Sequence, residues 1–343
     1  MKRSKILLSI GAIAAVLCLL AATSALLLFT NLNHRGKTLY IFIDHDDSVD
    51  SVYAKIYETA APRQTLGLKF AATLLSYPQH LHTGKYALPE KISPFTLVRK
   101  LRGRMQEPVE LVVTTTNTVE NLAAKLATKL EADSATLAQT FLNPTLLEQI
   151  NLDSANIIGI FIPNTYEVYW DIAPEDLLLR FKRESDAFWT PQRQELAQLQ
   201  GLSPQQVLTL ASIVEKETAN NAEKPQIAAM YLNRLAINMK LQADPTVKFA
   251  LRNFTLRRIL HDHLRTESPY NTYLCEGLPP GPICNPAPVS IEAVLRPANH
   301  NFLYMCANPD FTGTHLFATT YGEHLRNAKN YAKTLDERGI KAN

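Results

Sequence analysis

The sequence has almost no excess of charge of either sign. It contains 35 Lys and Arg residues and 32 Asp and Glu residues, which gives a formal net charge of +3. Proteins that bind polyanions usually carry a marked basic excess, so we expect no nucleic-acid partner. A glycine-rich phosphate loop and a nucleophile elbow are also missing. Their absence argues against a P-loop nucleotide hydrolase and a serine hydrolase of the α/β type.

Cysteines and clustered metal ligands are scarce. Cys275, Cys284 and Cys306 follow the N-terminal region, and in an oxidising compartment an odd number leaves at least one unpaired. Cys275 and Cys284 could bridge a short loop, although nothing in the sequence requires it. The adjacent ligand types at His261–His263 would not converge on one ion from a helix. We therefore expect neither a metal nor another cofactor.

One long apolar run stands at the N-terminus. Ile6–Phe29 contains no charged residue, and the preceding Met1–Lys5 is basic. The run is long enough to span a bilayer and longer than the apolar region of an ordinary signal peptide. Because flanking cations stay in the cytoplasm, we predict an uncleaved single-pass transmembrane helix and export of the rest of the chain. Small residues around Ala21–Ala25 leave a cleaved signal peptide as the alternative.

Short strand and helix patterns alternate after the apolar run. Asn31–Lys37 is interpreted as a polar linker, and Leu39–Ile43 is a β-branched and aromatic run typical of a strand. Asp46, Asp47 and Ser48 then offer cap residues for a pattern of helical spacing. Val109–Thr114 and Thr118 repeat this order, so we predict an α+β fold. Small units of this kind resemble LysM-like modules that bind glycan chains, and two ordinary α+β units without a ligand are the alternative.

The second half of the chain predicts helices, turns and two aromatic or proline-rich segments. The expected elements are helices at Ser134–Leu147, Lys224–Ile237 and Glu323–Leu335, a tight polar turn at Leu241–Val247, a short helix capped by Ser290, and paired strands at Phe302–Cys306 and His315–Ala318. On the helix after residue 224, Tyr231 is expected on the apolar face and Asn233-Arg234 on the other side. Gly159–Trp170 is aromatic and suits either a carbohydrate surface or core packing.

Ser268–Pro288 is rich in proline, glycine, asparagine and tyrosine. Such a composition excludes a helix and a central strand. A long, stiffened loop inside a compact region is usually functional. Its tyrosine and asparagine side chains would suit the faces and hydroxyl groups of sugars.

Ser203–Thr218 predicts the helix around which the chain is organised. Ser203 accepts a backbone N–H as the cap, Pro204 suits the first helical position, and Gln206 completes a capping box.

One face of this helix is apolar except for a single carboxylate. At about 100° per residue, the residues that share it are Val207, Leu210, Ile213, Val214 and Glu217. Glu215 lies toward the flank of Leu208, and Lys216 points to solvent. Desolvation raises the pKa of a carboxyl group, as a general acid near neutral pH requires. The alternatives for Glu217 are a side chain turned out to water and one paired with a buried Arg.

A series of motifs extends from this helix toward the C-terminus. In order these are Leu210–Thr218 (LASIVEKET), Asn233–Leu235 (NRL), Leu241–Val247 (LQADPTV), Tyr270–Tyr273 (YNTY) and Gly277–Pro286 (GLPPGPICNP). The series closely resembles the YceG-like (MltG) endolytic murein transglycosylases. The resemblance is strong from about Gly159 onward and architectural from Leu39 to about Met105.

This resemblance implies an enzyme of the bacterial inner membrane, with its N-terminus in the cytoplasm and its catalytic domain in the periplasm. Such an enzyme cuts nascent peptidoglycan strands internally, leaves 1,6-anhydro-N-acetylmuramic acid ends and terminates strand elongation. The resemblance also suggests partnership with the cell-wall synthesis machinery. The organisation that we predict is a cytoplasmic stub and anchor at 1–30, a LysM-like glycan-binding module at 38–105 and a larger mixed α/β catalytic domain at 106–343.

The family's catalytic acid is the second Glu of its Glu-Lys-Glu-Thr motif, which falls on Glu217. No second catalytic carboxylate is required, because the nucleophile is the C6 hydroxyl of the substrate, whereas an ordinary glycosidase needs a pair. The candidate substrate-binding residues are Gln242, Asp244, Thr246, Tyr270, Asn271, Tyr273 and Asn285. Asn164 replaces a usual acidic residue and Ala287 a usual glycine, and both departures concern the local geometry around the substrate.

Two other functions remain open. A muramidase-type hydrolase would use Glu217 with Asp244 and would leave reducing ends. A non-catalytic, membrane-anchored scaffold would bind glycan strands through Leu39–Gly103 and recruit the synthesis machinery.

Overall fold

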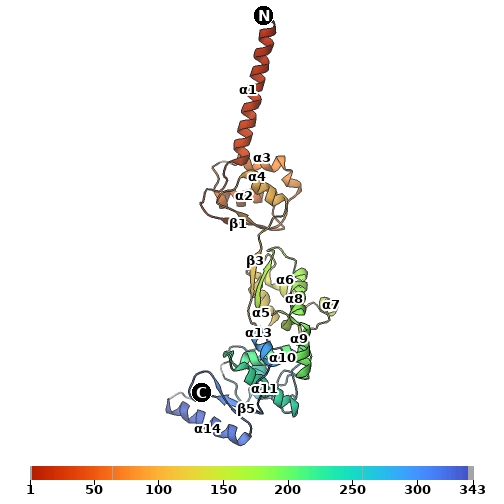
Figure 1. Cartoon of the computed structure of the whole chain (residues 1–343), viewed down its shortest axis with the longest axis vertical. Coiled ribbons are helices and arrows are strands. Elements are labelled where there is room, and N and C mark those ends of the chain that lie inside the picture. Colours follow the sequence, from red (N-terminus) through yellow and green to blue (C-terminus); the bar gives the residue numbers. More distant parts are fainter. Residues whose placement is uncertain (1, 64, 257, 339–343) are drawn as a thin grey trace. The chain divides into compact units, whose positions relative to one another are not determined.

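The computed structural model describes residues 2–63, 65–256 and 258–338. Met1 of the predicted basic stub and residues 339–343 of the predicted C-terminal domain lie outside this range. The chain forms two compact units (Figure 1). The first unit comprises Met1–Glu110, Lys129–Glu131 and Glu167–Ile172, and the second unit comprises Leu111–Thr128, Ala132–Tyr166 and Ala173–Asn343. Helices predominate and short strands accompany them, which confirms a mixed α+β fold.

The first unit contains a strand pair covered by helices. Its elements are α1 (Lys2–Phe29), β1 (Leu39–Ile43), α2 (Val49–Ala60), α3 (Leu66–Leu74), the 3-10 helix η1 (Tyr77–Gln79), β2 (Gly84–Leu88) and α4 (Pro94–Arg102). β1 and β2 pair antiparallel, from Leu39 opposite Leu88 to Ile43 opposite Gly84. Of the three cap residues that the sequence offers, Ser48 caps α2, because its side chain accepts the N–H of Ser51.

Helix α1 contains the predicted apolar run. Its segment Leu7–Phe29 is long and apolar enough to cross a membrane. Membrane anchors and signal sequences both have such a helix.

Residues 31–37 are not the free polar linker that the sequence predicts. Leu28 and Leu32 belong to the core of the first unit, and Leu32 is 2% exposed. Asn33 is also buried, and its Nδ2 donates to the carbonyl oxygens of Leu88 at 3.0 Å and Pro89 at 2.9 Å. The polar composition of this segment suggested a linker. The amide contacts of Asn33 join residues more than fifty positions apart, so the local sequence does not reveal them.

The second unit is mainly helical. Its elements are α5 (Val119–Ala127), α6 (Ser134–Phe141), α7 (Pro144–Gln149), the 3-10 helix η2 (Ile157–Ile160), α8 (Pro174–Phe188), α9 (Pro191–Leu199), α10 (Pro204–Glu217), α11 (Lys224–Ala236), α12 (Asp244–Ala250), the 3-10 helix η3 (His263–Arg265), α13 (Pro288–Leu295), β5 (Tyr304–Ala307), β6 (His315–Ala318) and α14 (Tyr321–Glu337). β5 and β6 form the predicted antiparallel pair. β3 (Val109–Val113) pairs with β4 (Asn164–Val168).

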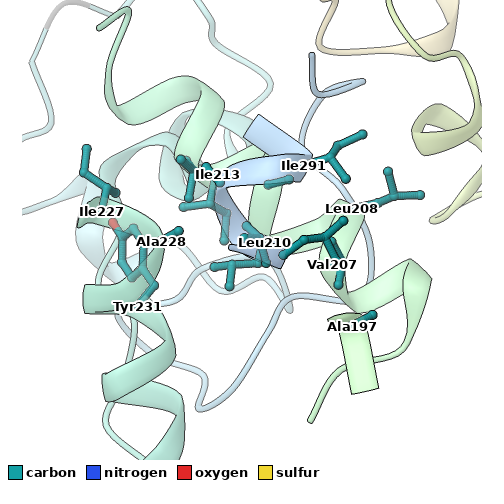
Figure 2. Packing of buried hydrophobic residues seen from close by; sticks show 14 of the residues in the cluster. Ala197, Val207, Leu208, Leu210, Ile213, Ile227, Ala228, Tyr231 and Ile291 are labelled. Atoms are coloured by element: carbon teal, nitrogen blue, oxygen red, sulfur yellow. The ribbon is translucent and has the colours of Figure 1, made fainter. Parts of the chain in front are cut away.

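Helix α10 is the centre of the second core. The capping box of Ser203 and Gln206 is formed as predicted. Residues 207–214 are all buried, so α10 is enclosed on every side and not only along the one predicted face. Figure 2 shows its apolar side chains against Ile227, Ala228 and Tyr231 of α11 and Ile291 of α13. A polar position such as Ser212 was not recognisable as buried from hydrophobic periodicity.

Three local predictions are wrong for reasons of turn and cap chemistry. The expected helix at Ser134–Leu147 breaks at Asn143, which caps α7 ahead of Pro144. The tight polar turn expected at Leu241–Val247 ends early, because α12 begins at Asp244 and Pro245 fits the first turn of a helix. Ser290 does not cap α13, which starts at Pro288, and its hydroxyl instead contacts Glu215.

The aromatic segment Gly159–Trp170 contributes mainly to the core. Phe161 and Tyr166 are 0% and 5% exposed, and both rings contact Phe181 edge-on at 5.1 and 5.2 Å. The possible bridge between Cys275 and Cys284 is not formed. The Sγ of Cys284 is buried and lies 3.5 Å from the carbonyl oxygen of Ser212.

Candidate functional site

Glu217 is the last residue of α10, and its side chain lies half-buried against α11. Tyr231, 1% exposed on the facing helix, donates its hydroxyl to Oε1 of Glu217 at 2.5 Å. Fourteen residues separate the two in the chain, and the packing of α10 on α11 brings them together. Neither alternative for Glu217 applies: it is not turned fully to water, and none of the ion pairs among the described residues includes it.

The surroundings of Glu217 favour its neutral form. Burial raises the pKa of this carboxyl from its ordinary 4.5 to about 7. The hydrogen bond from Tyr231 acts in the opposite direction, the negative charge of Asp244 raises the pKa further, and the charges of His315 and Arg234 lower it. A carboxyl group that titrates near neutral pH can act both as an acid and, once ionised, as a base.

Glu215, only two residues earlier, has very different partners. Its Oε2 accepts hydrogen bonds from the Nζ of Lys224, at 2.9 Å, and from the hydroxyl of Ser290. The hydroxyl of Thr115 lies 3.5 Å from its Oε1. Lys224 is itself 3% exposed. Glu215 is therefore a half-buried, charge-paired group that joins α10 to α11 and α13, whereas the contact of Glu217 is with a neutral hydroxyl.

The sequence did not indicate that Arg234 is buried. It was expected on the outer side of its helix, but it is 7% exposed. Its Nε donates to the carbonyl oxygen of Leu303 at 2.6 Å, and its NH1 donates to that of Leu241. Arg234 thus holds the strand region and the segment before Asp244 around α11. Arg234 is part of the NRL motif that contributed to the family resemblance, but helical periodicity assigned it to the outer side of the helix.

The sequence also did not indicate the contact between Glu223 and His315. Glu223 is 6% exposed, and it accepts the backbone N–H of His315 at 2.6 Å while its other oxygen lies 2.9 Å from the ring Nδ1. This pair fixes the start of β6 beside α11. The two residues are 92 positions apart, so no local sequence signal connects them.

Asp244 and Tyr273 form a hydrogen-bonded pair near Glu217. The hydroxyl of Tyr273 donates to Oδ1 of Asp244 at 2.6 Å, and Asp244 is exposed. Gln242 is also exposed, and its backbone adopts a left-handed φ of 49° while its N–H donates to the carbonyl oxygen of Thr272. Gln242, Asp244 and Tyr273 are therefore accessible enough to meet a substrate.

The remaining predicted binding residues are occupied within the fold. Asn271 and Asn285 are 0% exposed, as is Thr246. Asn271 donates to the carbonyl oxygens of Leu264 and Thr266, and Asn285 donates to those of Thr114 and Phe161. The Thr246 hydroxyl donates to the carbonyl oxygen of Ala243. These three side chains shape the loops, and in this structure they offer no exposed atom to a glycan.

Tyr270 is half-buried, and its ring centroid lies 4.7 Å from that of Phe249 on α12. It lines a cavity rather than the immediate surroundings of Glu217. The Gly277–Ile283 part of the loop is anchored to α10, since the N–H of Ile283 donates to the hydroxyl of Ser212 at 2.9 Å. A Cβ at Gly281 would lie 2.1 Å from the carbonyl oxygen of Ala155, so the close approach requires glycine here.

Comparison with known proteins identifies one family. The profile of the YceG-like family matches residues 41–330. A protein named endolytic murein transglycosylase in Bacillus subtilis (strain 168) is 33% identical over 181 residues, which are 52% of this chain and 49% of that protein. A protein of the same name in Streptococcus pneumoniae (serotype 2, strain D39) is 26% identical over 329 residues, which are 87% of this chain and 59% of that protein.

The chain thus spans about half to three fifths of the length of these curated relatives. A crystal structure of a putative YceG-like protein from Listeria monocytogenes aligns with a TM-score of 0.59 and 26% identity. That alignment covers 84% of this chain and 98% of the Listeria chain.

Proposed function

The chain belongs to the YceG-like family, and from this premise we propose that it is a membrane-anchored, endolytic peptidoglycan lytic transglycosylase. It cleaves the bond between N-acetylmuramic acid and N-acetylglucosamine in nascent glycan strands. The product ends are 1,6-anhydro-N-acetylmuramic acid, and cleavage terminates elongation of the strand. The names of the two curated relatives support this activity.

The observation that carries the proposal is the environment of Glu217. Burial raises the pKa of this carboxyl group to about 7, and within the described residues its hydrogen-bond partner is the Tyr231 hydroxyl. A neutral carboxyl at this position supplies the general acid that glycosidic cleavage needs.

In the proposed mechanism, protonated Glu217 donates its proton to the glycosidic oxygen as the bond to C1 of the muramyl unit breaks. The resulting carboxylate then removes the proton from the C6 hydroxyl, and the C6 oxygen forms a bond to C1. Glu217 ends protonated, and no water is consumed. The Tyr231 hydroxyl holds the carboxylate between these two steps.

Asp244 is the alternative second carboxylate. Its charge acts on Glu217, which favours the muramidase-type hydrolase as the second candidate. Its Oδ1 already accepts the Tyr273 hydroxyl, and a cyclising mechanism needs no activated water. We therefore assign Asp244 and Tyr273, together with Gln242, to substrate binding.

For the first unit we propose membrane attachment through α1, with the N-terminus in the cytoplasm and the catalytic residues outside it. The hydropathy of Leu7–Phe29 supports an anchor. We also propose that residues 38–105 form a LysM-like module that binds the glycan strand. Association with the cell-wall synthesis machinery belongs to the same proposal.

The test is a digest of intact peptidoglycan by the full chain in detergent, beside Glu217→Gln, with the products analysed by mass spectrometry. We expect anhydro-ended fragments from the wild type alone. Fragments with reducing ends, one water heavier, would instead establish hydrolysis with Asp244. Binding without cleavage by either protein would indicate the non-catalytic scaffold.

A further inference from the structure

The second unit contains a cavity that the proposed reaction does not use. Its volume is about 420 Å³, which is within the usual size of ligand sites. It is lined by the start of α5, the end of α12 and the proline-rich loop. We call it the Tyr270 cavity, and its principal residues are Asn117, Glu120, Leu142, Phe249, Arg252 and Tyr270.

The lining of the Tyr270 cavity combines an aromatic wall with an unused polar atom. The rings of Phe249 and Tyr270 lie 4.7 Å apart, inclined by 46°. The Oδ1 of Asn117 is buried and has no hydrogen-bond partner within the described part of the chain. A buried acceptor without a donor is costly, and an N–H or O–H group of a ligand would satisfy it. Apolar rings beside such an acceptor suit a ligand with both an apolar face and polar hydrogens, as a sugar has.

The charges of the cavity favour an uncharged ligand. Its charged lining residues are Glu120 and Arg252, whose carboxylate and guanidinium lie 3.7 Å apart. Opposite charges at this distance leave no net charge to attract an anion, and Asp153 adds a negative charge near Tyr270. The stem peptides of peptidoglycan carry carboxylates, whereas its N-acetylhexosamine units carry hydroxyl and acetamide groups. The lining therefore fits the sugars better than the peptides.

The same two segments that reach Glu217 also reach this cavity. Asp244, whose charge acts on Glu217, begins α12, and Phe249 lies five residues later, or about 8 Å along the helix axis. On the loop, Tyr273 contacts Asp244, and Tyr270 stands three residues before it. The surroundings of Glu217 and the Tyr270 cavity therefore share α12 and the proline-rich loop.

We propose that the Tyr270 cavity binds an N-acetylhexosamine unit of the same glycan strand that Glu217 cleaves. The site is a distal subsite, in which the rings of Tyr270 and Phe249 contact the sugar face and Asn117 accepts a hydrogen from its acetamide or hydroxyl group. This inference rests on the proposed function, because it takes the substrate from there.

The test uses the full chain in detergent with Glu217→Gln, so that no ligand is consumed. Binding of chitobiose and chitohexaose, which are short and long uncharged N-acetylglucosamine oligomers, is measured by titration calorimetry. We expect Asn117→Leu and Tyr270→Leu each to weaken chitohexaose binding about tenfold, the equivalent of one good contact. Chitobiose is too short to reach from Glu217 to the Tyr270 cavity. Its affinity for a site beside Glu217 should therefore change little in the two cavity variants.

Tyr321→Leu is the matched control, because it makes the same change at a ring that is 58% exposed and outside the cavity lining. Thermal melts establish that each variant is folded. If either variant unfolds, Phe249→Leu replaces it, since the ring of Phe249 is assigned to the same sugar face and is only partly buried. Unchanged chitohexaose affinity, or an equal loss for both oligomers, would overturn the assignment.

The peptidoglycan digest separates this inference from the proposed function. Anhydro ends from the wild type together with cavity variants that bind chitohexaose normally would refute the subsite alone. Cavity-dependent binding of chitohexaose without anhydro ends would refute the proposed reaction and leave a sugar-binding cavity.

Discussion

Glu215 and Glu217 are two residues apart on one helix and have different chemistry because their partners differ. Glu215 receives the ammonium of a buried lysine and the hydroxyl of Ser290. Glu217 receives the hydroxyl of Tyr231, and burial raises its pKa to about 7. A carboxyl group that is desolvated beside a neutral donor becomes protonated more easily. The role of each residue therefore depends on α11 and α13 rather than on α10 itself.

The raised pKa of Glu217 makes stability depend on pH. Between its ordinary pKa of 4.5 and about 7 the folded chain binds a proton that the unfolded chain has released, so the free energy of unfolding decreases as pH rises through this window. Glu217→Gln removes the ionisation. We expect the variant, relative to the wild type, to gain up to roughly 3 kcal/mol between about pH 4.5 and about pH 8. Urea denaturation of both proteins at the two pH values measures this, and a difference that does not change with pH would contradict it.

Tyr231→Phe tests the hydrogen bond to Glu217. Because this bond stabilises the ionised carboxylate, its loss should raise the pKa of Glu217 further, by about one unit. The basic limb of kcat/KM should move to higher pH by the same amount, and kcat should fall about tenfold because the carboxylate is less well oriented.

The control for Tyr231→Phe is Tyr321→Phe, which removes a hydroxyl from an exposed ring. A loss of activity in Tyr231→Phe without any shift of the basic limb would show that the hydroxyl supports the fold but does not change the pKa of Glu217.

At the scale of elements, α10 is held by polar contacts at its end and by apolar packing along its length. Lys224 at the start of α11 and Ser290 in α13 both contact Glu215. Ser212 accepts the N–H of Ile283, so the proline-rich loop is attached to the same helix. Together these contacts set the position of the last turn of α10, which carries Glu217.

Lys224→Met should be strongly destabilising. Lys224 is 3% exposed, and its removal leaves the Glu215 carboxylate, whose side chain is only 16% exposed, without a cation. We expect a loss of about 3–5 kcal/mol in the free energy of unfolding. Lys182→Met is the matched control, since Lys182 pairs with an Asp186 side chain that is 61% exposed, and this change should cost less than about 1 kcal/mol. The midpoints of urea denaturation of the two variants measure the two losses of stability. Equal midpoints would argue against a structural role for the Lys224–Glu215 ion pair.

At the scale of the whole molecule, the apolar N-terminal helix α1 and the first unit are continuous. The last turn of α1 contributes Leu28 to the core of the first unit, and Leu32 and Asn33 follow it there. Helix α1 therefore ends inside a folded unit rather than in a flexible tether. This differs from the sequence-based prediction of a linker at residues 31–37.

Truncation tests this continuity. A segment that begins at Gly36 lacks Leu28, Leu32 and Asn33, whereas one that begins at Leu27 keeps all three. Each buried leucine contributes about 1.5–3 kcal/mol, so we expect the shorter segment to show a clearly lower melting temperature for the first unit. Differential scanning calorimetry of the two segments measures it. The same melting temperature in both would mean that residues 27–35 do not belong to the folded unit.

Several features followed from local sequence alone. The cap and proline at Ser203-Pro204 predicted the start of α10, and the spacing of its apolar residues placed Glu217 on the face toward the core. The apolar run, Ser48 as a cap and the strand pair near the C-terminus were also predictable. These properties depend on residues within one or two turns of each other, so a short window of sequence contains the necessary information.

The tertiary structure decided what each polar group meets. The contacts of Glu217 with Tyr231, of Glu215 with Ser290 and of His315 with Glu223 join residues 14, 75 and 92 positions apart. The burial of Arg234, Asn271 and Asn285 likewise depends on segments that pack from elsewhere. Hydrophobic periodicity records which side of an element is apolar, but a pKa depends on the groups that surround a side chain in space. The sequence therefore placed Glu217 at the end of α10 on the face toward the core, and only the packing of α10 against α11 and α13 determined the surroundings in which its pKa is raised to about 7.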